Sequence, residues 1–518
     1  MTAPSDQQLL RRFQGAGGSL PRRNIVLVTA TLVVLTDTTI GDGGSGDPVD
    51  DITVIRDLDT GFPMIEGPSL TGALRAYLSR MPTVPEAAAD AVFGSEDHQA
   101  RVRPRDAVPT PGYPTTGHRE SVAVAPGTAT AAEAALFSSE VVSAGTEFPL
   151  VWEIEVPPDP REATPLLEVV VAAATALAQG RIRLGQRTHA GRGRVRGTRW
   201  SARLFDMCGR VEDHKVWYSA GYTGQPRLTP PPDPAATPAA ALTTALSEWA
   251  APGGAAITFA EPEIAPVGVL ELAVHLRNEE VHGDRRVPTA VLLGGPSTGD
   301  NLTAALTRPV VGDDGTVREA PIDSGTAALS MLRRTCWQVL TELASASPKP
   351  AAALRAARIR FVDLFGSHPA DDVTEVQASR IAVDEDAFVG AAVVTQPQVA
   401  LNPIAHLPIS GALAMTQPVF GGGRTVTIQI VDPTDFDLGL FTVVLKELHA
   451  GNGARVGADA ASGNGRRLAV SVLGRYDEPD GAAPEVVPHR WNSWDEIRGD
   501  EWIVERHRRF VEEFDNVC

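Results

Sequence analysis

The feature of this chain that most limits its fold is an internal repeat, because four sequence signatures occur twice in the same order along its 518 residues. Each copy opens with an alternating apolar run, at Asn24–Asp37 and at Gly268–Gly283, which predicts a strand. A turn, the end of a strand and the start of a helix follow, at Thr53–Arg80 and at Pro309–Arg334. Such a repeat predicts two similar units in one chain.

The other two signatures are a Phe-Gly element and a helix that runs into a glycine-rich turn. The Phe-Gly element lies in Ala91–Ala107 and in Asp363–Ala387, and the helix with its turn lies in Pro165–Gly197 and in Leu438–Val470. In each copy the order is strand, helix, strands, helix, strand, which is the βαββαβ pattern of a ferredoxin-like fold. The sequence therefore predicts an α+β protein with two ferredoxin-like domains in tandem.

The domain boundaries are predicted from changes in composition. The segment Gln225–Leu246, between the two copies, is rich in proline and alanine, as is typical of a linker. We expect an N-terminal arm, a first domain, a linker, a second domain and a charged tail, at residues 1–22, 23–210, 211–262, 263–484 and 485–518. The tail holds Trp491, Trp494 and Trp502 and is expected to end in a short helix. These tryptophans would either anchor a neighbouring subunit or pack against their own domain.

Cysteine content and charge limit where the protein works and what it binds. Three widely spaced cysteines without a CxxC pair favour a reducing cytosol. The start lacks the apolar core of a signal peptide and no apolar run reaches ~20 residues, so we expect a cytoplasmic protein without a membrane span. The formal net charge of -18 argues against nucleic acid. However, Arg181–Arg199 carries seven arginines and no acid, so one basic groove can exist on an acidic protein.

The string from Val54 to Arg75, VIRDLDTGFPMIEGPSLTGALR, resembles the signature of the CRISPR RAMP superfamily (repeat-associated mysterious proteins). The Phe-Gly element and the late glycine-rich loop occur in the order that this family shows. Arg119–Val156 resembles the block in which a protruding hairpin, the thumb, leads into a strand. The resemblance covers most of Asn24–Leu204 and, more loosely, Gly268–Tyr476.

Within this superfamily, the chain is most similar to the repeated backbone subunit of type III effector complexes, some of which are tandem fusions. The resemblance implies a modified, RRM-like version of the ferredoxin fold. It also implies subunits that stack along a guide RNA, with thumbs that kink the paired target RNA where it is cut. The implied partners are guide RNA (crRNA), complementary target RNA and other CRISPR effector subunits.

The same resemblance implies a catalytic residue in the first copy. The family's catalytic aspartate matches Asp51, in the Asp/Gly-rich loop before Val54, and Asp50 takes its place if the register slips by one residue. The implied cofactor is Mg²⁺ or Mn²⁺, with Asp51 as its ligand. The matching position of the second copy is Thr307, which has no carboxylate, so we expect that copy to be inactive. The plain alternative is that the Asp51 loop is only a solvated turn.

Two further segments are predicted to contact RNA phosphates. The helix that begins near Gly67 offers free N–H groups, with Ser69 as its predicted cap and Ser324 as the cap of the second copy's helix. The arginines among the glycines of 185–197 suit phosphates because guanidinium groups bind them with two N–H bonds. The predicted RNA-binding residues are Arg56, Gly67, Ser69, Thr71, Arg75, Arg187, His189, Arg192, Arg194 and Arg196. A plain capped helix and a hairpin with solvated arginines are the alternatives.

The sequence thus predicts a guide-RNA-binding subunit that cleaves target RNA at one site through Asp51. Three other functions stay open at this point. A scaffold would bind guide RNA without cutting, and a guide-processing endonuclease would use His189 as a general base. A protein-interaction module that has lost RNA would fit the net charge of -18 best. The Cys/His spacing does not support a zinc site.

Overall fold

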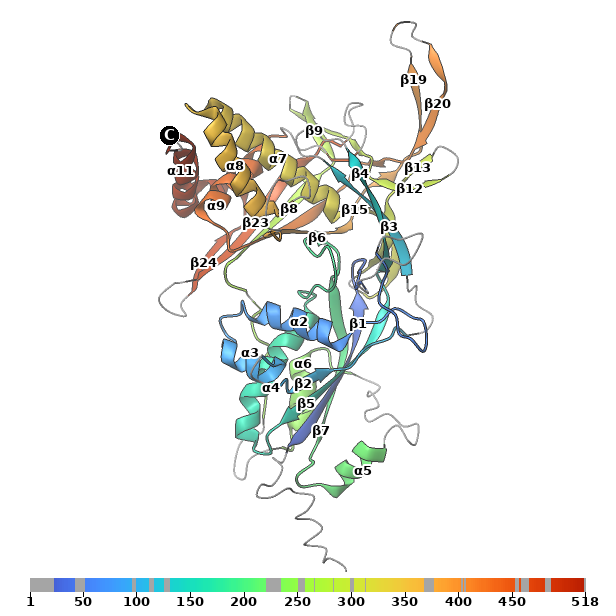
Figure 1. The fold of residues 1–518 in the computed structure, drawn as a ribbon, viewed down its shortest axis with the longest axis vertical. Helices are drawn as coiled ribbons and strands as arrows, with labels where there is room; N and C mark the ends of the chain where they lie inside the picture. The colour runs from blue at the N-terminus through green and yellow to red at the C-terminus, as the bar shows by residue number, and fades with distance from the viewer. Residues whose placement is uncertain are drawn as a thin grey trace, which may run out of the picture.

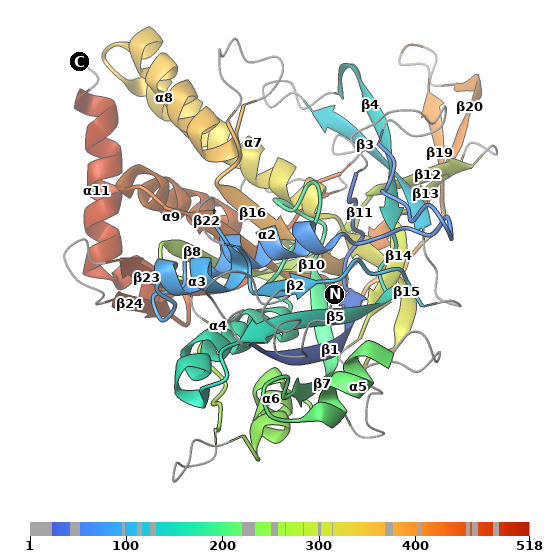
Figure 2. The same cartoon turned by 60° about the horizontal axis from the view of Figure 1, so that its bottom comes forward.

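The structure is a computed structural model (Figures 1 and 2). It describes residues 23–41, 52–95, 99–110, 116–124, 131–219, 234–249, 257–264, 266–282, 284–298, 302–312, 314–367, 377–401, 404, 407–451, 456–457, 465–479 and 486–516. The predicted α+β class is confirmed, because helices and several antiparallel sheets alternate along the chain.

The first half is built on a four-stranded antiparallel sheet in the order β2-β5-β1-β7. Along the chain its elements run strand, helices, two strands, helix, strand. They are β1 (Asn24–Val34), α2 (Gly67–Leu78), α3 (Glu86–Phe93), β2 (Val102–Pro104), β5 (Glu147–Val156), α4 (Pro160–Ala178) and β7 (Val195–Phe205). The first strand of the predicted βαββαβ pattern therefore lies between the third and the fourth.

The core of the first half lies between this sheet and its helices. Alternate residues of β1, such as Val26 and Val28, point into the core, and so do Leu70, Leu74 and Leu78 of α2. The spacing of these leucines places them on one face of the helix, as the sequence predicts. Part of the predicted linker also belongs to this core, because α6 (Pro238–Leu246) buries four of its residues there: Ala239, Ala241, Leu242 and Leu246.

Two other elements of the first half lie outside that core. A hairpin of β3 (Thr116–Val124) and β4 (Ala131–Val142) forms a separate two-stranded sheet, in the block that the sequence analysis assigns to a thumb. The short helix α5 (Val211–Ser219) lies beside β7 in both views (Figures 1 and 2).

The second half repeats the strand order of the first. Its elements are β8 (Val269–Arg277), α7 (Gly325–Ala346), α8 (Pro350–Phe365), β16 (Ile381–Asp384), β22 (Gly423–Val431), α9 (Asp435–Ala450), β23 (Leu468–Pro479) and β24 (Val486–Trp491). Its sheet has the order β24-β23-β8-β22-β16-β6, so β8 again lies between the third and fourth strands of the pattern. The edge strand β6 (Ala190–Gly191) comes from the first half and pairs in parallel with β16.

Smaller strands of the second half lie outside this sheet, in small sheets of two to four strands. They are β9 (Glu279–His282), β10 (Arg285–Pro288), β11 (Ala290–Val291), β12 (Gly294–Thr298), β13 (Leu302–Ala305), β14 (Thr307–Val311), β15 (Val317–Asp323), β17 (Asp386–Ala387), β18 (Ala392–Val393), β19 (Gln396–Leu401), β20 (Pro408–Thr416) and β21 (Val419–Phe420). The hairpin of β19 and β20 projects from the body of the molecule (Figure 1).

The C-terminal tail packs against its own half, which is one of the two alternatives considered for its tryptophans. It contains α10 (Trp494–Gly499) and α11 (Glu501–Asn516), and α11 lies along α9. Trp491 is buried, and Trp494 and Trp502 pack against the core of the second half. In the described part of the chain, each helix is too short or too polar to span a bilayer.

Candidate nucleic-acid interface

The predicted catalytic residue Asp51, and Asp50 beside it, lie outside the described residues. The next residue, Ile52, forms a parallel bridge with Ser139 on β4, and its carbonyl oxygen accepts the amide N–H of Glu140 at 2.8 Å. On the other side of the loop, Thr38 pairs with Val142 of the same strand. The chain therefore enters and leaves the Asp/Gly-rich loop at the base of the β3–β4 hairpin.

Glu140 holds the segment that follows Asp51. This carboxylate is buried and accepts the N–H of Val54 at 3.1 Å. Its other oxygen accepts an N–H of Arg56, whose second N–H donates to Gly61 O at 2.8 Å. Arg56 is thus half-exposed at the hairpin base, as an RNA contact should be, but its charge already has a partner.

The N-terminus of α2 is occupied by side chains of the protein itself. The N–H of Gly67 donates to Asp106 at 2.8 Å, and the hydroxyl of Thr71 donates to Gly67 O at 2.9 Å. Arg75 forms an ion pair with Asp90 at 2.7 Å. The cap prediction for Ser69 is wrong, because the helix begins two residues earlier, with Glu66 as N-cap and without a side-chain cap bond.

The arginine loop does not project into solvent as a hairpin would. Its residues 190–191 form β6, and the carbonyl of His189 accepts the N–H of Val383 at 2.8 Å. This loop is therefore part of the joint between the two halves. Burial, and the charge of Arg187 next, lower the pKa of His189, which favours a neutral imidazole.

Arg192 is the most buried of the predicted RNA-binding arginines in this loop. Its side chain is buried, and its two terminal nitrogens donate to the hydroxyls of Ser139 at 3.0 Å and Ser121 at 3.1 Å. Among the described residues its Nε has no partner and no carboxylate forms an ion pair with it. Burial, followed by the charges of Arg119 and Arg187, lowers the pKa of Arg192 to about 9. The charges of Glu385 and Asp37 act in the opposite direction, and a bound anion would act with them.

The remaining arginines of the loop lie near Arg192. Arg187 has a left-handed backbone (φ 57°) and stacks its guanidinium 4.1 Å from the ring centre of Phe137, and burial lowers its pKa. Arg194 and Arg196 are half-buried. Arg196 pairs with Val33 at the start of β7, which places it in the sheet rather than in a loop.

A buried ionic network crosses the joint beside these arginines, and the sequence analysis missed it. Arg119, on β3, forms an ion pair with Glu385 of the second half, with one N–H bond of 2.7 Å, and also faces Asp37 at 3.4 Å. Arg308 of the second half reaches Asp37 at 3.1 Å and His118 O at 3.2 Å. Burial disfavours the charged form of each of these side chains. Nevertheless, Glu385 and Asp37 raise the pKa of Arg119, and Arg119 lowers the pKa of Glu385.

The second half differs at each equivalent position. Thr307, which matches Asp51, is exposed at the start of β14. The predicted cap of α7 is confirmed, because the Ser324 hydroxyl accepts the N–H of Ala327 at 3.1 Å. The N–H of Gly325 donates to Glu385 at 3.3 Å, so here too a carboxylate occupies the helix start.

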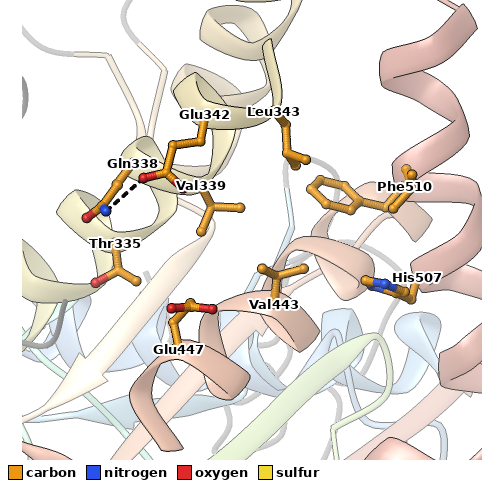
Figure 3. Close-up of a pocket in the computed structure, with 10 residues that line it drawn as sticks. Thr335, Gln338, Val339, Glu342, Leu343, Val443, Glu447, His507 and Phe510 are labelled. Atoms are coloured by element: carbon orange, nitrogen blue, oxygen red, sulfur yellow. Dashed lines mark hydrogen bonds between the residues drawn. The ribbon is translucent and has the colours of Figure 1, made fainter. Parts of the chain in front are cut away.

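A groove of about 360 Å³ lies between α7, α9 and α11 of the second half (Figure 3). Its lining is largely apolar, with Val339, Val443 and Phe510, and it carries the carboxylates of Glu342 and Glu447. None of the predicted RNA-binding residues lines it, and two carboxylates repel phosphate, so we do not assign RNA to this groove.

In the described residues, the β3–β4 hairpin contacts Arg192 through Ser121 and Ser139, and Arg187 through Phe137. Residues 31–196 match the model of the RAMP superfamily. The match covers about a third of the chain. No curated protein matches the sequence.

The predicted metal ligand, Asp51, lies outside the described residues. Within the described ranges, no group of three or more His, Cys, Asp or Glu side chains is arranged to hold a metal ion. The two acids nearest the hairpin base, Asp37 and Glu140, are already paired with arginines.

Proposed function

We propose that this chain is a backbone subunit of a type III CRISPR effector complex with two RAMP domains in tandem, at 23–210 and 263–484. It binds guide RNA and cleaves complementary target RNA at one site through Asp51. The observation that carries the proposal is the family match over 31–196, because this segment contains both the Asp51 loop and the arginine loop. The repeated strand order supports a second domain of the same kind.

In this proposal, RNA runs along the base of the β3–β4 hairpin. The support is the surplus of positive charge there, where Arg192 is buried against hydroxyls and Arg187 lies beside it. A phosphate would add negative charge to that of Glu385 and Asp37 and would accept charge-assisted hydrogen bonds. Contacts from Gly67 and Arg75 require them to leave Asp106 and Asp90, so we expect the arginine loop to contribute more.

The proposed cut is a transesterification at the kink made by the hairpin. The 2′-hydroxyl of the target ribose gives its proton to solvent and its oxygen attacks the adjacent phosphorus. The bond to the 5′-oxygen breaks, this oxygen takes up a proton from solvent, and the products are a 2′,3′-cyclic phosphate and a 5′-hydroxyl. The protein would hold the kinked backbone in line for this attack. Mg²⁺ or Mn²⁺, held by Asp51, would stabilise the charge on the phosphate.

The RNA-binding part of the proposal is tested with the assembled complex and labelled guide RNA over a series of salt concentrations. We expect Arg187→Ala with Arg192→Ala to weaken binding at least tenfold and to lower the salt slope by about two, because two phosphate contacts are lost. The matched control is Arg498→Ala, an exposed arginine paired with Asp495 on α10. Unchanged affinity and slope would remove the arginine loop from the RNA path.

A further inference from the structure

The outer face of the second half's sheet is where the first half binds. Glu271 of β8 points away from the helices of its own half and forms an ion pair with Arg181 of the first half at 2.9 Å. On the neighbouring strand, Gln429 accepts a bond from Arg183 at 3.5 Å. Burial raises the pKa of Tyr77, on α2, to about 12, and the charges of Arg181 and Glu271 act on this pKa in opposite directions.

The two halves can be aligned residue by residue at this face. After α4 in the first half and α9 in the second, the same backbone bond joins residues nine positions apart: Leu184 N–H donates to Gly193 O at 2.8 Å, and Val456 N–H donates to Gly465 O at 2.9 Å. The strands β7 and β23 then follow, each with a one-residue irregularity in its pairing with the first strand of its half. Gly193 and Gly465 are therefore equivalent positions.

We call the outer face of the second half's sheet the docking face. The equivalent face of the first half is found by counting residues from these two glycines. Arg203 lies ten residues after Gly193 and pairs with Leu27, and Arg475 lies ten residues after Gly465 and pairs with Glu271. Leu27 thus stands where the second half has the carboxylate that binds its neighbour.

In the first half, α5 covers this face. Trp217 packs on Leu27 and on Phe205, with the two aromatic rings 5.1 Å apart and edge to face, and Leu27 and Phe205 are fully buried. Asp213 of the same helix accepts the N–H of Asp206 at 3.0 Å and pairs with Arg203 at 3.4 Å. The apolar anchor and the paired arginine both hold α5 in place.

We propose that α5 is an assembly cap, which closes the sheet face of the first half to any further unit of this fold, including a second copy of the chain. Leu27 gives an incoming arginine no counter-charge, and Trp217 occupies its place, so the exclusion is both electrostatic and steric. Head-to-tail contacts of this kind continue without limit unless one end is blocked. The inference rests on the tandem arrangement of the proposed function.

Further units would then join only at the end formed by the second half. There the β19–β20 hairpin leaves Leu407 and Leu413 mostly exposed (64% and 56%). At the base of the corresponding β3–β4 hairpin of the first half, Arg119 and the carbonyl oxygen of His118 contact the second half. We therefore expect one copy of this chain in each complex, at one end of the stack.

The cap is tested by the molar mass of the full chain in light scattering over a range of concentrations. The wild type should stay at 54.7 kDa. Leu27→Glu with Trp217→Asp should release α5, make it sensitive to protease and raise the mass at least twofold at the same concentrations. The matched control, Val211→Asp, changes an exposed residue of α5 and should stay monomeric.

Three outcomes would overturn the cap: a wild type that forms concentration-dependent chains, a released α5 without association, or two adjacent copies in the native mass of the assembled complex. The last measurement needs no variant, so a misfolded variant leaves the inference testable. None of the three readouts involves RNA cleavage or affinity. Loss of RNA binding by the complex therefore contradicts the proposed function and leaves the cap untouched. Any of the three outcomes above contradicts the cap and leaves the proposed function untouched.

Discussion

The two halves of the chain share a strand order but use it differently. In both, β1 and β8 are central strands whose inward residues form the core, and a carboxylate binds the N–H that opens the first long helix. They differ on their outer faces and in their loops: the first half has the basic loop and a sheet face covered by α5, and the second has Thr307 and a sheet face occupied by the first half. The core residues thus maintain the same fold in both halves, while the outer faces and the loops differ between them.

The largest effect on stability is expected from breaking the joint between the halves. Arg119→Ala leaves Glu385 buried without its partner, which should lower the free energy of unfolding by about 3–5 kcal/mol. Urea denaturation, followed by fluorescence, measures this change. Arg75→Ala removes the more exposed pair with Asp90 and should cost less than about 1 kcal/mol. Equal losses for both variants would contradict a joint held by buried charge.

A smaller effect is expected where the first half's loop meets α7. A side chain at Gly325 would overlap the carbonyl oxygen of Ala190, so Gly325→Ala should push β6 away and cost about 1–3 kcal/mol. Hydrogen exchange of the Val383 amide, which donates to His189, should become faster. Gly72→Ala has open space around it and should leave this exchange unchanged. A slow Val383 amide in Gly325→Ala would show that β6 is not held by this contact.

The helix caps offer a direct comparison of the two halves. Ser324→Ala removes the cap of α7 and should cost about 1 kcal/mol, whereas Ser69→Ala removes no cap bond and should change stability by less than half of that. Thermal unfolding of both variants measures the difference. A larger loss for Ser69→Ala would reverse the assignment of the caps.

The smallest change in stability is expected from the titration of Glu385. The folded pKa of Glu385 lies below its ordinary value of 4.5, so its contribution to stability is present above that pH and is lost as the pH falls through the lower, folded value. Denaturation midpoints between pH 6 and 3 should fall less steeply in Glu385→Gln than in the wild type. Parallel curves would mean that Glu385 is not an ionised partner of Arg119.

The sequence predicted the features that depend on local pattern. The leucines of α2, the cap at Ser324 and the repeated order of strands and helices follow from spacing and residue type. The cap at Ser69 was wrong because Gly67 and Pro68 begin the helix before that serine is reached. A serine before a helix is a cap only if the helix starts directly after it.

The ionic joint and the cap could not be predicted, because they depend on contacts between distant segments. Arg119 and Glu385 are separated by 266 residues, and sequence spacing carries no information on such a pair. The arginines of Arg181–Arg199 predict a basic segment, but their pattern does not show that residues 190–191 pair with β16. The helix α5 lies in the predicted linker, where composition indicates only an exposed segment.

The central claim, that the first half cuts target RNA and the second does not, is tested most directly by cleavage of an end-labelled, guide-matched RNA. The assembled complex with Mg²⁺ is compared with Asp51→Ala and Asp50→Ala, and Asp59→Ala serves as a control in the nearby turn. The account predicts that Asp51→Ala abolishes one specific product, by at least 100-fold, with target binding unchanged. An unchanged set of products in Asp51→Ala would contradict it and leave this chain as a guide-RNA scaffold.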